Sequence, residues 1–409
     1  MFKNISVAVI ILTAIILLTG CDNLLEDYRE TITEHQAAPY VRPPTEQITV
    51  SNFDEFITTL INLIMDHETS IKVLYEGEDV QAVLLRAGDE IMHEHPIGVY
   101  AVANITLDAT RIVTHFEVDI EIEYKRTKEQ LDSIVTVATE LSMRQQLLSK
   151  MSEYVEEAVF RTRLRLDEEI ITEFVRDIYY QNPHLIVMLP IVTVEIFPEE
   201  GSDRIYEIKF GNMESPMMMQ RFGELLTHYI QRNAQLAFGS TDPELLLSLV
   251  SSLMSSTDFN EGASRTIHVH GAQNLAATAF GALIRGNAVG EGFAMAFKAL
   301  ADELGFDCRV VLGHYDGMIH AWNIVLLYGD FYHIDVAMCV VNGLEAAFLK
   351  TDEDFEDMYS WDRENTVICE GELTLDDIPV PEDPDEPDDP DGSEDQNGES
   401  NNEEDGPLI

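Results

Sequence analysis

The first half of the chain contains two similar series of helix-like and strand-like segments. In each series an apolar stripe at helical spacing comes first, a proline follows, and two strand-like segments come next. Apolar and polar residues alternate most clearly in VDIEIEY and VTVEIF, as they do in half-buried strands. The helix-like segments are residues 53–65 and 166–178, and the strand-like ones are 99–107, 116–124, 185–197 and 205–210. We therefore predict two small α+β modules, residues 49–150 and 151–235, of which the second repeats the first.

A further folded region is predicted from residue 241 to residue 370. It is expected to contain an amphipathic helix capped by Thr241 and Asp242, a second long helix that Gly305 ends, a strand, and a hairpin. These elements are, in chain order, residues 243–254, 291–304, 308–312, 320–327 and 331–336. Helices and strands are mixed along the whole chain, which predicts the α+β class.

The two ends of the chain differ in composition from the rest. Residues 1–20 have a short basic start and an apolar run too short to span a membrane comfortably, as in an export signal. The run ends in Leu-Thr-Gly before Cys21, which resembles a bacterial lipobox, so we predict that Cys21 carries lipid. Residues 21–48 are polar and contain prolines, as expected of a flexible tether. Residues 376–409 are acidic, rich in proline and free of Lys and Arg, which predicts a disordered tail.

The charge balance restricts the possible partners. The 409 residues include 25 Lys and Arg against 75 Asp and Glu, a formal net charge of −50. Such a chain cannot replace phosphate counterions, which excludes nucleic acid as a partner. It also disfavours electrostatic docking on an anionic membrane. The predicted membrane contact is therefore the lipid on Cys21, at the outer face of a bacterial cell membrane.

The remaining cysteines, Cys308, Cys339 and Cys369, each lie in an apolar, strand-like context. Three cysteines outside the cytoplasm allow at most one disulfide, and such sparse usage is not that of a disulfide scaffold. We expect them to be buried and inert, and the sequence leaves open whether two of them pair.

The hairpin carries the candidate chemistry. If Tyr328 and Gly329 form a two-residue turn, Asp335 pairs with Trp322 and points to the same face as His320. The β-carbons of His320 and Asp335 are then diagonal neighbours about 7–8 Å apart, within reach of a side-chain hydrogen bond. An aspartate that orients an imidazole is the lower half of a nucleophile–base–orienter triad.

The stretches AFGALIRGNAVGEGFAMAFKALADELGFDCRVVLG and HAWNIVLLYGDFYHIDV resemble the bacterial transglutaminase-like superfamily, which shares a papain-like Cys-His-Asp arrangement. The resemblance covers roughly residues 241–349. It implies a papain/transglutaminase-like fold for residues 241–370, with His320 as the base and Asp335 as its orienter. It also implies a cysteine at the start of the second long helix, where this sequence has Gly290.

Glycine at position 290 excludes a thioester there, because it has no side chain. An enzyme that loses its nucleophile keeps only oxyanion stabilisation and binding. We therefore interpret His320 and Asp335 as a vestigial base and orienter beside a cleft that still binds a ligand. The residues predicted to line that cleft are Glu291, Gly292, Trp322 and Asn323.

Two rescues of catalysis are considered. In one, Cys339, expected on a strand four residues after Asp335, replaces the missing nucleophile. In the other, a metal is held by Glu291, His320 and Asp335, or by the pair His268 and His270 on one strand face. An acidic residue favours the first turn of a helix in any case, and histidines in a polar loop are usually surface residues. We therefore predict no metal and no cofactor.

The sequence as a whole predicts an exported, lipid-anchored surface protein with a catalytically inactive transglutaminase-like domain. This pseudoenzyme is expected to bind a peptide, a cell-wall fragment or an envelope protein. One alternative is an active cysteine hydrolase or acyl transferase, and the other is a purely structural envelope protein. The two modules contain no catalytic constellation, and we interpret them as spacers or docking surfaces.

Overall fold

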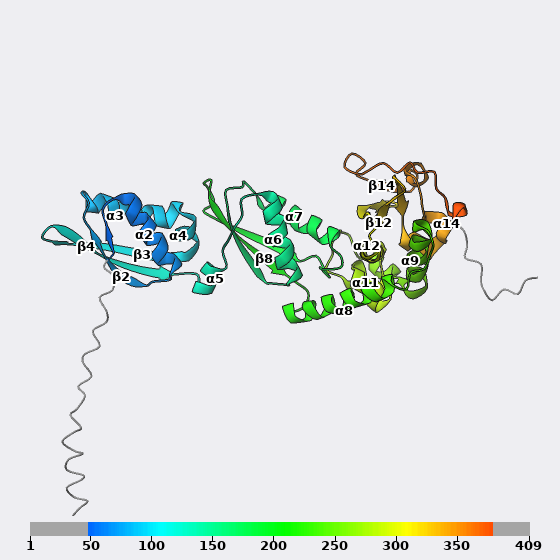
Figure 1. Cartoon of the computed structure of the whole chain (residues 1–409), viewed down its shortest axis with the longest axis horizontal. Coiled ribbons are helices and arrows are strands. Elements are labelled where there is room, and N and C mark those ends of the chain that lie inside the picture. The colour runs from blue at the N-terminus through cyan, green and yellow to red at the C-terminus, as the bar shows by residue number, and fades with distance from the viewer. Residues whose placement is uncertain (1–47, 379–409) are drawn as a thin grey trace, which may run out of the picture. The chain divides into compact units, whose positions relative to one another are not determined.

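The computed structural model describes residues 48–378, which form two compact units with mixed α+β structure (Figure 1). The boundary between the two units lies after Asp132. The predicted signal peptide, Cys21, the tether as far as residue 47 and residues 379–409 of the tail lie outside the described residues. Within the described range, no helix combines the length and the apolar character needed to cross a membrane.

The first unit is built on a four-stranded sheet. Its elements are β1 (Thr49–Val50), α2 (Phe53–Met65), β2 (Ser70–Tyr75), α3 (Val80–Asp89), the π-helical η1 (Glu90–Glu94), α4 (Pro96–Ala101), β3 (Val102–Ile112), β4 (His115–Tyr124) and α5 (Lys128–Asp132). The strand order is β1-β2-β4-β3, with β1 parallel to β2 and the other neighbours antiparallel. Helix α2 begins where the Asn52 side chain accepts a hydrogen bond from the Glu55 backbone N–H.

The second unit opens with a sheet of the same strand order and the same strand directions. Its elements are β5 (Val135–Thr136), α6 (Glu140–Ser152), β6 (Glu157–Thr162), α7 (Glu168–Gln181), β7 (Ile191–Phe197), β8 (Arg204–Gly211) and the long helix α8 (Pro216–Ala234). The order is β5-β6-β8-β7, with β5 parallel to β6 and the other pairs antiparallel.

The module boundary predicted after residue 150 is too late in the chain. The first unit ends at Asp132, and β5 follows between α5 and α6. The β-branched residues of this segment pair as a strand. A new helix then begins at Thr139, whose side chain exchanges capping hydrogen bonds with Ser142. Helix α6 therefore belongs to the second unit.

The rest of the second unit carries the helix–strand–hairpin series. Its elements are α9 (Asp242–Ser256), β9 (Asp258–Phe259), α10 (Glu261–Ser264), η2 (Leu275–Ala277), α11 (Ala279–Arg285), β10 (Asn287–Ala288), α12 (Gly290–Glu303), β11 (Cys308–Tyr315), β12 (Met318–Leu327), β13 (Asp330–Ile334), α13 (Val336–Asn342), α14 (Leu344–Ala347), α15 (Asp352–Phe355), β14 (Tyr359–Trp361) and η3 (Leu375–Asp377). The sheet order is β13-β12-β11-β14, and all neighbours are antiparallel.

One hydrophobic core runs through the second unit. It includes Phe160 and Tyr206 from the β5-β6-β8-β7 sheet, Phe293 and Phe297 from α12, and Trp322 from β12. The predicted segments 151–235 and 241–370 therefore share a core and do not form two separate domains. Helix α12 lies in the middle of this core, which explains why most of its residues are apolar or small.

The hairpin has the predicted register. Leu327 pairs with Asp330, so Tyr328 and Gly329 form the turn, with φ of 54° and 106°. Asn323 pairs with Ile334, which puts Asp335 level with Trp322, just past the last residue of β13.

Two details after the hairpin differ from the sequence predictions. Asp335 caps a helix, α13, because its side chain accepts from the Met338 backbone N–H, so Cys339 lies on a helix and not on a strand. The first three residues of the predicted tail are ordered: Thr374 caps the turn η3, and Ile378 packs with 5% exposure.

Candidate functional site

His320 and Asp335 form a buried hydrogen-bonded pair. His320 Nε2 lies 2.6 Å from Asp335 Oδ2, and the two residues are 7% and 1% exposed. A carboxylate can only accept, so Nε2 of His320 is the donor in this hydrogen bond. The Met338 backbone N–H donates to Asp335 Oδ1 at 3.1 Å. Asp335 thus orients the ring while its second oxygen starts helix α13.

Sequence reasoning missed a third donor, the hydroxyl of Tyr359 in β14. It donates to Asp335 Oδ2 at 2.9 Å, and its ring stacks on Phe355 at 3.8 Å between centroids. Burial raises the pKa of Tyr359, and so does the nearby Asp335, which keeps the hydroxyl protonated as a donor. No sequence motif marks this residue, because β14 returns to the sheet after three short helices and pairs with it over only three residues.

Gly290 is the first residue of α12, directly against the His320 ring. A Cβ built on Gly290 would come within 2.4 Å of both Nδ1 and Cε1 of His320. Real Cβ atoms do not approach other atoms so closely, so the imidazole fills the space that a side chain at position 290 would take. The ring cannot move aside freely, because it is buried and tied to Asp335.

A cavity of about 370 Å³ opens beside His320. It lies between the segment that contains β9 and α10 and the segment that contains β12 and α13. Its lining is mostly apolar, with one acidic and one basic side chain: Phe259, Glu261, Ser264, Arg265, Tyr315, Met318, Ile319, His320, Met338, Val341 and Asn342.

The four residues predicted to line the cleft do not line this cavity. Glu291, Gly292, Trp322 and Asn323 are all buried, and none borders it. The physical reason is that helix α12 and strand β12 are central elements, so their side chains face neighbouring elements and not solvent. Asn323, for example, donates from Nδ2 to the Ala294 carbonyl at 3.0 Å.

Glu291 is turned away from His320 and belongs to a different contact. Its Oε1 accepts from the Tyr180 hydroxyl at 2.8 Å and from the Gly271 N–H at 3.0 Å. These hydrogen bonds connect helix α12 to helix α7, which contains Tyr180, and to the loop at Gly271. The considered metal site of Glu291, His320 and Asp335 is therefore not assembled.

The other rescue residues are also poorly placed. His268 is exposed, whereas His270 lies near Glu291, so the two imidazoles do not share a strand face. Cys339 is fully buried, and burial together with the neighbouring Asp335 raises the pKa of its thiol to about 12. Such a thiol is protonated at neutral pH and is not a nucleophile. Cys308, Cys339 and Cys369 are free and buried, with no disulfide among the described residues.

No protein-family model matches the sequence, and no curated protein matches it. Some solved structures resemble parts of the chain, and three of them are as follows. A protein described as a TGase is 14% identical with a TM-score of 0.25, over 53% of this chain and 60% of that one. A proposed cysteine protease from Cytophaga hutchinsonii is 14% identical with a TM-score of 0.23, over 37% and 64%. A proposed protease from Parabacteroides distasonis is 8% identical with a TM-score of 0.21, over 65% and 40%.

The chain spans less than two thirds of the length of each of these proteins. At such identities and TM-scores the likeness establishes no activity for this chain.

Substitution of Gly290 should destabilise the protein. We expect Gly290→Ala to lower the free energy of unfolding by about 1–3 kcal/mol, because the added Cβ forces the His320 ring off Asp335. The Cβ of Gly290→Cys would approach the His320 ring in the same way, so we expect this variant to be destabilised too. Urea unfolding followed by circular dichroism measures the change. Gly262→Ala is the matched control, since the nearest atom to its Cβ lies at 3.5 Å. A Gly290→Ala protein as stable as the control would show that the ring moves aside at no cost.

The thiols of Cys308, Cys339 and Cys369 should resist iodoacetamide in the native protein at pH 8. Burial raises the pKa of each, to about 12 for Cys339 and Cys369, so very little thiolate is present at pH 8. Mass spectrometry should find all three labelled after denaturation in urea and none before it. Rapid native labelling of Cys339 would contradict the assignment and favour a cysteine enzyme.

Proposed function

We propose that this protein is an exported surface lipoprotein whose C-terminal region is a transglutaminase-like domain without a catalytic nucleophile. Its cleft beside His320 would bind a peptide, a cell-wall fragment or an envelope protein. The observation that carries this proposal is that His320 fills the place of the missing side chain while an adjacent cavity stays open. Binding can outlast catalysis, because it depends on the shape of a cleft and not on a thiol.

The enzyme alternative lacks a nucleophile near His320. Position 290 has no side chain, and the thiol of Cys339 is buried and protonated. A Cβ on residue 290 would come within 2.4 Å of His320 Nδ1, so a side chain at this position has no room beside the imidazole. These observations favour a binding role over hydrolysis or acyl transfer.

The composition of the cavity indicates what kind of group it would accept. Phe259, Met318, Met338 and Val341 supply apolar surface, and the two methionines can adapt to different shapes. The charged lining residues Glu261 and Arg265 pair with each other at 3.0 Å. In a chain of net charge −50 this cavity is locally almost neutral. It therefore suits an uncharged apolar side chain better than a strongly basic ligand.

The two sheets with the same strand order support a further part of the proposal, that the two modules are repeats. As repeats without catalytic residues they would act as spacers that hold the C-terminal cleft away from the membrane. The purely structural alternative assigns no role to the cavity beside His320, and that cavity is the reason we favour binding.

The binding proposal predicts that a charge introduced at the rim of the cavity weakens ligand binding. Met318→Glu and Val341→Glu should each weaken binding about tenfold or more, since each replaces an apolar contact with a charge that must lose its water. Both residues are about half exposed, at 53% and 52%, so the fold should tolerate the changes. Binding of the full chain to a panel of muropeptides and apolar-rich peptides, measured by calorimetry, tests this prediction.

The matched control is Leu85→Glu, which adds the same charge at a 76% exposed position in the first unit. It should leave the Kd unchanged. Failure of every probe to bind wild type, or equal loss in the control, would count against the binding proposal.

The lipoprotein proposal predicts incorporation of palmitate at Cys21. Cells that express the wild-type chain should yield a protein labelled with radioactive palmitate in the membrane fraction. Cys21→Ser should yield an unlabelled protein, because the thiol that accepts the lipid is gone. Palmitate label that persists in Cys21→Ser would contradict this part of the proposal.

A further inference from the structure

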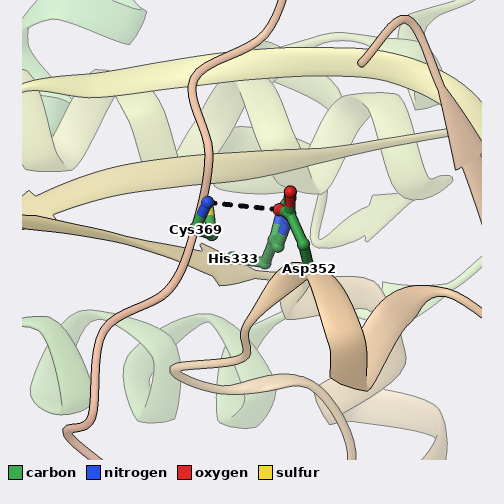
Figure 2. Close-up of side chains that lie close together, drawn as sticks. All are labelled: His333, Asp352 and Cys369. Carbon is green, nitrogen blue, oxygen red and sulfur yellow. Dashed lines mark hydrogen bonds and ion pairs between the residues drawn. The ribbon is translucent and has the colours of Figure 1, made fainter.

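Three side chains of different chemistry meet on the far side of Trp322 from His320. His333 comes from β13, Asp352 from the first residue of α15, and Cys369 from the segment after β14. One ligand-type atom of each lies within 4.8 Å of the other two. Figure 2 shows the three side chains gathered at one point. Because His, Asp and Cys are all zinc ligands, the cluster at first suggests a metal site.

The hydrogen bonds of His333 argue against a metal. The indole Nε1 of Trp322 donates to His333 Nδ1 at 3.0 Å. An indole N–H can only donate, so Nδ1 carries the lone pair and Nε2 carries the proton. Burial lowers the pKa of His333, which keeps the ring neutral. A metal on Nε2 would need the ring proton on Nδ1, directly against the Trp322 N–H, whereas metal-binding histidines donate from their second nitrogen.

The donors of the cluster converge on Asp352 instead. His333 Nε2 donates to Oδ1 at 2.8 Å, and the backbone N–H of Cys369 donates to the same oxygen at 3.2 Å. Burial, together with the nearby Asp352 carboxylate, raises the pKa of the Cys369 thiol to about 12. The thiol is therefore protonated, as in a buried structural network whose donors are all satisfied.

We propose that His333, Asp352 and Cys369 are positioning residues that fix Trp322, and through it His320, and are not a metal site. The proposal rests on the proposed function, because His320 forms one wall of the cleft. The Trp322 ring is fully buried, and it lies 6.3 Å from the His320 ring with the planes 21° apart. Its single polar atom is the one bonded to His333.

The segment after β14 holds the cluster in place. The Asp352 N–H donates to the Cys369 carbonyl at 2.8 Å, so these two residues are joined through both main chain and side chain. Gly371 then lies against the Tyr332 ring, where a Cβ would come within 2.3 Å of Cε1. The Leu373 N–H donates to the Tyr332 hydroxyl at 3.3 Å. Because this segment contacts β13 at Tyr332 and α15 at Asp352, the His333 imidazole has little freedom to turn away from Trp322.

Asp352→Asn tests the proposal, because an amide can present an N–H where His333 needs an acceptor. The full chain has two tryptophans, so protein labelled with ¹⁵N in His and Trp gives two indole signals, which Trp361→Phe assigns. In Asp352→Asn we expect the Trp322 indole N–H to exchange with solvent about tenfold faster, the factor expected for one lost hydrogen bond. The ring ¹⁵N signals of His320 should shift too.

Two variants serve as controls. Cys369→Ser keeps the backbone N–H that donates to Asp352 and should leave both signals close to wild type. Asp357→Asn makes the same charge change at an exposed position nearby and should have no effect. If His333 and Trp322 respond to Asp352→Asn while His320 keeps its wild-type signals, the positioning role is refuted.

Zinc alone tests the metal reading of the same cluster. Equimolar Zn²⁺ should leave the His333 ring signals unchanged, and a zinc-dependent shift that disappears in Cys369→Ser would overturn the proposal. None of these measurements needs a cleft ligand. A failed peptide-binding experiment would therefore reject the proposed function and leave the positioning result intact.

Discussion

Asp335 is an ionisable side chain with 1% exposure, and a buried carboxylate without donors would be strongly unfavourable. Its donors come from three elements: His320 from β12, the Met338 backbone from α13 and Tyr359 from β14. The same carboxylate therefore closes the hairpin, starts a helix and holds the last strand of the sheet. This requirement explains why the pair can persist without catalysis. Loss of Asp335 would leave the His320 Nε2 donor buried without this acceptor, and loss of His320 would remove one of the three donors to the carboxylate.

The hydrogen bond between His320 and Asp335 determines whether residue 290 can carry a side chain. With His320 held by Asp335, the ring has one place to lie, and that place overlaps the position of a side chain on residue 290. The helix start, the imidazole and the carboxylate are all present, yet the geometry is that of a packed contact and not of a nucleophile beside its base. Open space lies to one side, in the cavity between α10 and α13, where apolar side chains predominate. This cavity is the place that the proposed binding function would use.

The hairpin was predictable because its information is local. A two-residue turn sets the register, and the register sets which side chains share a face, so the pairing of His320 with Asp335 followed from about fifteen residues. The long helices were predictable from their apolar stripes for the same reason. Tyr359 was not, because nothing in its neighbourhood shows that β14 returns to β11. The prediction that Trp322 and Asn323 line the cleft is wrong. Both residues follow His320 closely in sequence, but they lie in a central strand of the sheet and are fully buried.

Trp322 separates two His–Asp pairs whose hydrogen bonds have the same direction, with Nε2 of the imidazole donating to the carboxylate in both. They differ in what meets Nδ1. For His320 it is the backbone of Gly290, next to a cavity, and for His333 it is the indole N–H of a buried ring. Residue types alone make the second pair, with Cys369 beside it, the more attractive metal site, whereas the direction of one N–H makes it a structural support. Donor direction is a property of the folded arrangement, since Trp322 and His333 become neighbours only through the register of β12 and β13. A list of ligand residues cannot contain it, and here it distinguishes the histidine bonded to a buried indole from the histidine that lines the cavity.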